Sequence, residues 1–383
     1  FSLWKSCNPQ KIFNKIMKIE FNNITDPLLN RDRIKKKISK VIDNRNFILG
    51  KEVNILEKKL SNFVNSKYTV TVSSGTDALL ISLLSLNLKK NSEVITPAFS
   101  YISSAEVIER AGLKPIFCDV EPDTALIDVK KLESLINKNT SCIIIVSLFG
   151  QIPDVKSLKK IKEKYNLPII EDGAQSFGSS YKNLRSGSIF DIGCTSFFPT
   201  KSLGCYGDGG SIFTNKKSIY LHAKQIRQHG QKKKYFFDLN GLNARLDTIQ
   251  AVVLLEKLKI FNSTIKRKRI IYKKYTKLLM NEKNIKFLEL KKDYNSCYPL
   301  INILAKKRNK LKLYLLKKNI PTTIYYPKPI SDQKLFKKNK SRLNMMNSKK
   351  LAKTIISLPF HLSLKDKQIH YIVKNIRDFY KKS

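Results

Sequence analysis

"KYTVTVSSGTDALLISLLSLNL" (residues 67–88) contains a β-branched run, a turn of small residues and a leucine-rich run, in that order. The β-branched run predicts a strand over 68–72, and the leucines predict a helix that begins near Thr76. Between them, the turn Ser73–Gly75 leaves free backbone N–H groups at the positive end of a helix dipole. This part of the chain therefore suits a bound phosphate group.

Strand-like and helical runs alternate on the C-terminal side of this stretch. The strand-like runs are 93–99, 114–120, 141–150 and 167–175, and the helical runs between them are 103–111, 129–137 and 155–165. The strands are apolar along most of their length, which is typical of strands buried on both faces of a parallel sheet. The alternation predicts an α/β fold with a mainly parallel sheet and with functional groups at the carboxyl ends of the strands.

The pattern changes after the helical run 246–261, where Lys-rich helices and short strands follow. We expect a large domain with an N-terminal arm over 17–262 and a smaller α+β domain over 263–383. Residues 1–16 precede Met17 and lack the apolar core and cleavage site of a secretory signal. We interpret them as an upstream or non-native extension.

The 383 residues carry a net charge of +43, and 42% of them are hydrophobic, so the chain can form two packed domains. Such a charge is compatible with nucleic acid or an anionic membrane as partner. The lysines are spread over every segment, however, and no zinc-finger, RRM or basic-zipper signature accompanies them. We interpret the charge as a solvated surface and expect no nucleic acid as partner, with a basic nucleic-acid-binding protein as the distant alternative.

The six cysteines have neither CxxC pairs nor the spacing of a zinc site. This predicts reduced, buried thiols, a cytoplasmic location and no metal. The longest apolar run, 142–150, is too short to span a bilayer, so we expect no membrane association.

Two charged residues stand in unusual settings. Asp172 follows the apolar run LPII, where an aspartate can bind a metal, cap a helix or hold a cationic ring nitrogen. Lys201 lies among small and apolar residues in SFFPTKSLGCYGDGG (196–210), where desolvation lowers the pKa of an amine and makes it nucleophilic. If the turn residues and Ser196 hold a phosphate, a ligand with an aldehyde for Lys201 and a ring nitrogen for Asp172 is pyridoxal phosphate. The residues that would hold its phosphate are Ser73, Gly75, Thr76 and Ser196.

Several stretches resemble the DegT/DnrJ/StrS family of sugar-nucleotide aminotransferases, over nearly the whole chain from Met17 onward. They are SSGTDALLISL, EVITPAFSYISSAEVI, EDGAQSFGSSYKNLRSG, CTSFFPTKSLGCYGDGGSIFT, RQHGQ and LNARLDTIQAVVLLEKL. The chain resembles in particular the subgroup that aminates C3 of UDP-2-acetamido-2-deoxy-3-keto-glucuronic acid for O-antigen and related surface polysaccharides.

The resemblance implies a pyridoxal-phosphate-dependent transferase of fold type I, with a mainly parallel seven-stranded sheet in the large domain and a smaller C-terminal α+β domain. It implies a homodimer with shared active sites, glutamate as amino donor and a keto-sugar nucleotide as acceptor. Lys201 would bind the cofactor's aldehyde and then move protons, while Asp172 would pair with the ring nitrogen. The other cofactor contacts would be Gly75, Thr76, Tyr101, Gln175, Ser196 and, from the partner subunit, Asn243. The substrate contacts would be Arg245, Tyr325 and Tyr326.

Some positions differ from the family pattern. Gly173 stands where alanine is usual, Tyr325 stands where relatives often carry histidine, and Ser331 stands where they often carry histidine or asparagine. Tyr325 and Ser331 lie on the expected substrate side, so a C4-aminating or dTDP-sugar aminotransferase of the same family is the alternative. Lys201 is retained, which disfavours the family's sugar dehydratases, where histidine replaces it.

Overall fold

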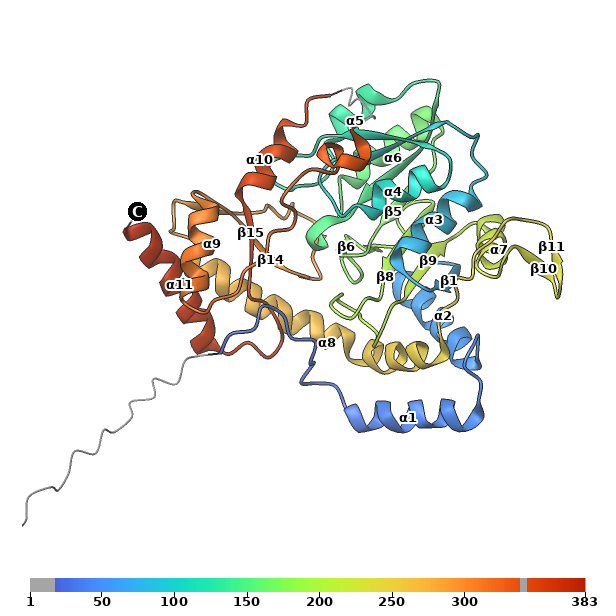
Figure 1. Ribbon diagram of the computed structural model, residues 1–383, viewed down its shortest axis with the longest axis horizontal. Helices are drawn as coiled ribbons and strands as arrows, with labels where there is room; N and C mark the ends of the chain where they lie inside the picture. The colour runs from blue at the N-terminus through green and yellow to red at the C-terminus, as the bar shows by residue number, and fades with distance from the viewer. Residues whose placement is uncertain (1–17, 338–342, 383) are drawn as a thin grey trace, which may run out of the picture.

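A seven-stranded sheet forms the centre of the large part of the molecule (Figure 1). The computed structural model describes residues 18–337 and 343–382, so the proposed extension 1–16 and Met17 lie outside the described residues. Four strand pairs are parallel, and β9 is antiparallel to both of its neighbours, which confirms the mainly parallel seven-stranded sheet. The strands in sheet order are β1 (Tyr68–Val72), β9 (Gly210–Thr214), β8 (Ile192–Ser196), β5 (Ile169–Asp172), β4 (Thr140–Val146), β2 (Glu93–Pro97) and β3 (Lys114–Cys118).

Helices cover both faces of this sheet. On one face a core that includes Leu79 of α3 and Ala223 of α7 packs on the strands, and on the other face a core includes Leu132 of α5 and Leu158 of α6. Burial on both faces explains why the strands read as continuous apolar runs. The helices are α3 (Gly75–Ser85), α4 (Ser103–Arg110), α5 (Val129–Leu135), α6 (Val155–Tyr165) and α7 (Lys217–Ile226).

Three further helices run along the large part of the molecule: α1 (Arg31–Asn44), α2 (Lys51–Val64) and α8 (Thr248–Leu279). Leu56 and Leu60 of α2 share a buried core with Phe261 of α8. The continuous helix α8 passes through residue 262, where the sequence suggests a domain boundary. The division into 17–262 and 263–383 stays a prediction.

A second, smaller sheet lies in the C-terminal part, which is therefore α+β in character. Its core includes Tyr275 from the end of α8, Ile303 and Ile372. The strands in sheet order are β12 (Ile285–Phe287), β14 (Ile301–Ala305) and β15 (Ile355–Leu358), and the helices are α9 (Arg308–Lys317), α10 (Met346–Thr354) and α11 (Asp366–Lys381).

Short elements complete the fold. A hairpin of β10 and β11 projects from the large part of the molecule (Figure 1). A third sheet has three strands in the order β13, β6 and β7. In the chain, β6 and β7 lie between two strands of the large sheet, whereas β13 lies between two strands of the small sheet. The bounds are β6 (Ser180–Tyr181), β7 (Leu184–Arg185), β10 (Gln231–Lys233), β11 (Phe236–Phe237), β13 (Tyr294–Asn295), η1 (Leu148–Gly150), η2 (Ile330–Asp332) and η3 (Lys334–Phe336).

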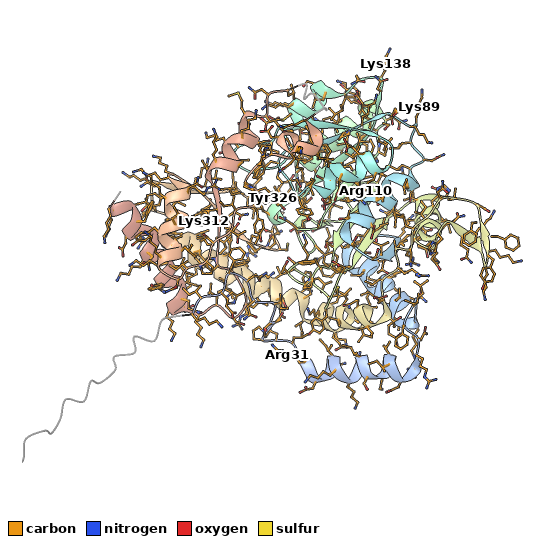
Figure 2. All side chains as sticks on the ribbon, in the orientation of Figure 1. Arg31, Lys89, Arg110, Lys138, Lys312 and Tyr326 are labelled. Atoms are coloured by element: carbon orange, nitrogen blue, oxygen red, sulfur yellow. The ribbon has the colours of Figure 1, made fainter. Side chains whose placement is uncertain are left out.

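The basic side chains are distributed over separate parts of the surface. Figure 2 shows Arg31 and Lys312 far from each other and from Lys89 and Lys138, which lie near each other on a third part of the surface. The sequence interpretation of the net charge as a solvated surface agrees with this distribution.

Candidate active site

The carboxyl ends of β1, β5 and β8 bring the predicted site residues together. Asp172 ends β5 and pairs in register with Cys194 of β8. Gly210 of β9 pairs with Val72 on one side and with Ser196 on the other. The turn after β1 and the loop after β8 therefore start from neighbouring points of the sheet.

Asp172 is a buried carboxylate with few partners. It is 4% exposed, and Oδ1 accepts a hydrogen bond from the backbone N–H of Ala174 at 3.1 Å. Burial raises the pKa of Asp172, while this hydrogen bond and the charge of Lys201 partly oppose the rise. A buried carboxylate of this kind favours a cationic partner. The protonated ring nitrogen of pyridoxal phosphate fits that requirement.

Lys201 lies in the tight loop after β8. Its backbone N–H donates a hydrogen bond to the carbonyl of Phe198 at 2.8 Å. The backbone N–H of Cys205 donates to the carbonyl of Phe197 at 2.7 Å, which closes the loop. Burial lowers the pKa of the Lys201 amine, and the charge of Asp172 partly opposes this effect. The lowered pKa agrees with the prediction from the apolar setting, and the mutual effect of the two charges places Lys201 within electrostatic range of Asp172.

The turn before α3 is closely packed against β8. A Cβ on Gly75 would lie 2.7 Å from the Cβ of Ser196, so only glycine allows this approach. Ser74 is the N-cap of α3, since its Oγ accepts from the N–H of Asp77 at 3.0 Å. The hydroxyls of Ser73 and Ser74 both donate to the Asp77 carboxylate. The backbone N–H groups of Gly75 and Thr76 remain at the helix N-terminus for an anion.

Ser196 contributes a hydrogen-bond donor to the turn before α3. Its Oγ accepts a hydrogen bond from the N–H of Phe198 at 3.3 Å, which leaves its own O–H able to donate. Gly75 and Ser196, which lie 121 positions apart in the chain, thus meet at the N-terminus of α3, where backbone N–H groups and a hydroxyl can donate to a phosphate cradled there.

Gln175 and Tyr326 connect the end of β5 to the C-terminal part of the chain. Gln175 Oε1 accepts from the N–H of Phe149 at 2.9 Å, and Nε2 donates to the Tyr326 hydroxyl at 3.2 Å. The Tyr326 ring lies 6.2 Å from the ring of Tyr101 and 5.8 Å from that of Tyr325. Burial raises the pKa of Tyr326, and the charge of Asp172 adds to the rise, so this phenol lies near Asp172 and stays protonated.

Tyr101 and Ser331 lie at the rim of this group. Tyr101 is 57% exposed, which leaves its ring face open to a ligand. Ser331 lies in η2, whose first residue, Ile330, donates to the carbonyl of Ala98 just beyond β2 at 2.7 Å. The segment with both tyrosines and Ser331 is thereby held at the carboxyl end of the sheet.

Asn243 and Arg245 flank Ala244, whose carbonyl accepts from the N–H of Ser73 at 3.0 Å. Asn243 is exposed, and within the described residues neither side chain has a hydrogen bond or an ion pair. The single chain therefore does not bring these two side chains into contact with the group around Asp172.

Sequence reasoning missed Glu171, the neighbour of Asp172. It is fully buried and accepts hydrogen bonds from Ser147 Oγ at 2.7 Å and Ser186 Oγ at 2.6 Å. Burial raises its pKa. Because successive side chains of a strand point to opposite faces, the pair Glu171–Asp172 indicates that a single carboxylate of the two faces the site. This alternation of side chains along the strand is the sequence signal that could have identified Glu171 as a buried carboxylate on the opposite face from Asp172.

Within residues 18–337 and 343–382, no group of three or more His, Cys, Asp and Glu side chains is placed to hold a metal ion. None of the helices in these ranges has the length and apolar character that crossing a membrane requires.

Residues 29–377 match the model of the DegT/DnrJ/EryC1/StrS aminotransferase family. A UDP-2-acetamido-2-deoxy-3-oxo-D-glucuronate aminotransferase of Pseudomonas aeruginosa is 39% identical, over 86% of this chain and 91% of that protein. A dTDP-3-amino-3,6-dideoxy-alpha-D-galactopyranose transaminase of Aneurinibacillus thermoaerophilus is 32% identical, over 90% of this chain and 95% of that protein.

A similar solved structure is that of NtdA from Bacillus subtilis with its cofactor PMP, the aminated form of pyridoxal phosphate. It superposes with a TM-score of 0.87 at 27% identity and covers 95% of this chain and 85% of that chain.

Proposed function

Since the chain belongs to the DegT/DnrJ/EryC1/StrS aminotransferase family and is a pyridoxal-phosphate-dependent sugar aminotransferase, we propose that it aminates C3 of UDP-2-acetamido-2-deoxy-3-keto-glucuronic acid. The family, the fold type I architecture and the cofactor inferred from the sequence are thereby confirmed. The C3 position and the UDP sugar are supported by the 39% identity to the Pseudomonas aeruginosa enzyme of that name.

The residues around Asp172 fit the cofactor. When bound, pyridoxal phosphate supplies an aldehyde that condenses with amines and a ring that takes up electrons from the neighbouring carbon. In our proposal the buried Asp172 carboxylate holds the ring nitrogen protonated. Tyr101 and Gln175 would contact the ring. Gly75, Thr76 and Ser196 would hold the phosphate.

Lys201 is the proposed catalytic amine. Its lowered pKa makes the neutral form more accessible than in an ordinary lysine, so Nζ would be suited to hold the cofactor's aldehyde and to accept a proton from the donor's α-carbon. The same amine would then return that proton as a general acid. The observation that carries the proposal is that Asp172 ends β5 while Lys201 lies in the loop that follows the neighbouring strand β8.

We infer that a second copy of the chain completes each site. Asn243 and Arg245 have no partner inside the described chain although they adjoin the phosphate turn, which supports their use by a neighbouring subunit in a homodimer. Arg245 would bind an anionic group of the substrate bidentately. Tyr325 and Tyr326 would contact the sugar from the C-terminal side.

We infer a cytoplasmic location and a role in the synthesis of O-antigen or another surface polysaccharide. The location is supported by the five described cysteines, which are buried free thiols. The proposed role in polysaccharide synthesis is supported by the resemblance to the subgroup that aminates the 3-keto-glucuronic acid.

A dTDP-sugar aminotransferase is the second candidate. The observation that favours it is the 32% identity to the Aneurinibacillus thermoaerophilus dTDP-sugar enzyme over 90% of this chain. The two candidates differ in the nucleotide and in the charge of the sugar, since a glucuronate carries a carboxylate.

The test is an assay of purified protein with pyridoxal phosphate, glutamate and a panel of keto-sugar nucleotides. We expect 2-oxoglutarate and a 3-amino sugar from the UDP-3-keto-glucuronate, and only slow turnover of the dTDP and 4-keto sugars. Lys201→Ala should abolish turnover, while Lys138→Ala, an exposed lysine, should not change it. Preferred turnover of a dTDP sugar would replace the substrate assignment, and the absence of transamination with every acceptor would reject it.

A further inference from the structure

The strand β1 stands at the edge of the large sheet, where β9 is its neighbour in the described strand order. Its last residue, Val72, lies directly before the turn Ser73–Gly75, where the proposed function places the cofactor's phosphate. The helices α2 and α7 both contact this strand (Figure 1). An edge strand has backbone groups that no second strand pairs, so other parts of the chain must satisfy these groups and hold the strand in place.

Arg227 and Glu57 hold this open edge at Thr71. Glu57 of α2 accepts hydrogen bonds from the backbone N–H and from the hydroxyl of Thr71, both at 2.9 Å. Arg227, which follows α7, donates from Nη1 to the carbonyl of Thr71 at 2.9 Å and to the Glu57 carboxylate at 2.8 Å. One ion pair thus satisfies both backbone groups of a single edge residue.

This ion pair is secluded from solvent. The side chain of Arg227 is 4% exposed, and that of Glu57 is 11% exposed. Two buried charges are costly to desolvate, and apolar residues in their place are often neutral or even stabilising. A gain in stability is therefore a weak reason for such a pair, whereas a fixed position of the strand end is a reason that the contacts with Thr71 support.

The backbone of Arg227 reaches the phosphate turn by a second route. Its carbonyl accepts from the N–H of Ala244 at 3.1 Å, and the carbonyl of Ala244 accepts from the N–H of Ser73 at 3.0 Å. Arg227 is therefore joined to Thr71 through its side chain and to Ser73 through Ala244. Thr71 and Ser73 flank Val72, so the entry to the turn is held at two points.

We propose that Arg227 is a positioning residue for the cofactor's phosphate, which acts by holding the end of β1 against α2 and the segment 243–245. The inference rests on the proposed function, in which Gly75 and Thr76 bind that phosphate, and deepens it. Hydrogen bonds weaken steeply when their geometry is lost, so a displaced strand end weakens the contacts of both N–H groups with the phosphate. Arg227 acts through the turn without touching the phosphate, and its effect is confined to ligands that carry one.

The test measures the affinity of the apoprotein for pyridoxal phosphate and for pyridoxal, which has the same ring and aldehyde but no phosphate. The variants are Arg227→Met and the double variant Arg227→Met with Glu57→Gln, in which no buried carboxylate is left without its cation. Loss of about one hydrogen bond to the charged phosphate should raise the Kd for pyridoxal phosphate about 10- to 100-fold in both variants. The Kd for pyridoxal should stay at the wild-type value.

Arg308→Met is the matched control. Arg308 is also buried and also donates to backbone carbonyls, those of Ile355 and Ala352 at 2.7 and 2.8 Å, but it lies in the C-terminal part of the chain. This variant should lower the Tm, because it leaves buried carbonyls without their donors, and it should leave both Kd values unchanged.

Fluorescence titration gives the Kd values without turnover, so a wrong substrate assignment would leave them untouched. Equal Kd values for pyridoxal phosphate in the folded double variant and in the wild type would overturn the proposal and leave the aminotransferase function intact. A parallel rise in the Kd for pyridoxal would also overturn it, because Arg227 would then act on the whole fold rather than on the phosphate turn.

Discussion

The side-chain amide of Gln175 donates to the hydroxyl of Tyr326 at 3.2 Å, across 151 positions of the sequence. This bond holds the loop after β5 and the segment before η2 in position relative to each other. Tyr326 also lies within electrostatic range of Asp172. The C-terminal part of the chain therefore contributes directly to the geometry around the proposed cofactor site.

Removing that hydroxyl should weaken the site without unfolding it. In Tyr326→Phe the ring keeps its contacts with Phe99 and Tyr101, but Gln175 Nε2 loses its acceptor. A neutral hydrogen bond of this kind contributes about 0.5–1.5 kcal/mol, so kcat/KM should fall about two- to tenfold. Steady-state kinetics and a melting curve measure the two effects.

The matched control for that variant is Tyr220→Phe, whose ring stacks on Tyr68 at the far end of β1. It should leave kcat/KM unchanged. Equal kcat/KM for Tyr326→Phe and the wild type would show that the bond does not position the site.

The charged carboxylate of Asp172 should lower the free energy of unfolding of the cofactor-free protein. Burial raises the pKa of Asp172 above its ordinary value of 3.8, so the folded state disfavours the charged form. The unfolded state loses the proton first as pH rises, and the destabilisation grows from about pH 4 upward and is complete above the folded-state pKa. Asp172→Asn should therefore raise the Tm of cofactor-free protein at pH 7 by about 2–4 °C, and by less at pH 4.

The same variant should lose transaminase activity, because a neutral amide cannot hold the ring nitrogen protonated. Calorimetric melting of the cofactor-free protein at both pH values measures the stability effect. A lower Tm for Asp172→Asn at pH 7 would contradict the argument that the charge is unfavourable in the empty fold.

The sequence predicts the elements of the large sheet well because each one has its own periodicity. The helix over 155–165 is found at the same bounds, and the strand over 68–72 likewise. The strand expected over 141–150 ends instead at Val146, and η1 follows it. Hydrophobicity alone does not end a strand, since the buried residues Leu148 and Phe149 continue the apolar run.

Contacts between distant segments are harder to predict. The sequence orders Asp172, Gln175 and Lys201 along the chain, and strand ends indicate that they meet at one edge of the sheet. No local pattern shows that Tyr326 bonds to Gln175, or that Lys268 borders the Lys201 loop, because both depend on how α8 and the C-terminal sheet pack. The hydrogen bonds from the hydroxyls of Ser73 and Ser74 to the Asp77 carboxylate also depend on side-chain geometry, which periodicity does not encode.

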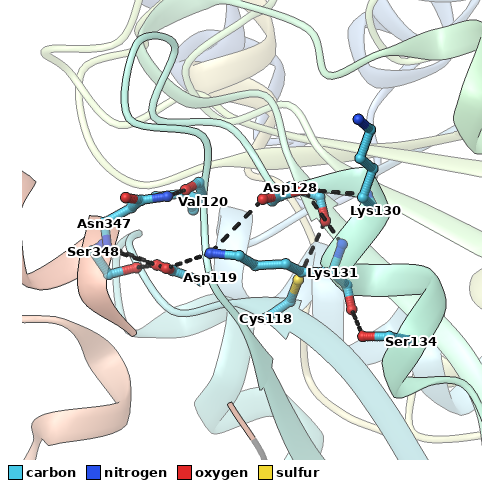
Figure 3. A network of polar contacts seen from close by, with 9 residues as sticks. All are labelled: Cys118, Asp119, Val120, Asp128, Lys130, Lys131, Ser134, Asn347 and Ser348. Atoms are coloured by element: carbon cyan, nitrogen blue, oxygen red, sulfur yellow. Dashed lines mark hydrogen bonds and ion pairs between the residues drawn. The ribbon is translucent and has the colours of Figure 1, made fainter. Parts of the chain in front are cut away.

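Asp119 attaches α10 to the large sheet (Figure 3). It lies just after β3 and accepts hydrogen bonds from the N–H and Oγ of Ser348 at 2.9 and 2.7 Å and from Lys131 Nζ at 3.0 Å. Burial alone would raise the pKa of Asp119, but these bonds outweigh it and hold the pKa below 3.8. The carboxylate therefore stabilises the fold at neutral pH, and this contribution is lost as pH falls through the folded-state pKa.

Asp119→Asn should destabilise the protein by about 2–4 kcal/mol at pH 7, because it leaves buried donors without a charged acceptor. Urea denaturation measures the difference, which should shrink at pH 3. The control Asp123→Asn removes an exposed ion pair with Lys286 and should cost about 0.5 kcal/mol or less. Equal effects of the two variants would mean that the attachment of α10 contributes no more than a surface pair.

Gly75→Ala should reduce cofactor affinity through a direct clash. The added Cβ would lie 2.7 Å from the Cβ of Ser196, so Ser196 or the turn must move away from the phosphate cradle. Overpacking of this size costs about 1–3 kcal/mol, which corresponds to a rise in the cofactor's Kd of about 5- to 150-fold. Gly112→Ala is the control, since its Cβ meets no atom within 4 Å but its φ of +74° strains an alanine. Fluorescence titration of apoprotein with pyridoxal phosphate should show weak binding in the first variant and wild-type binding in the second, and equal Kd values for both would contradict the cradle.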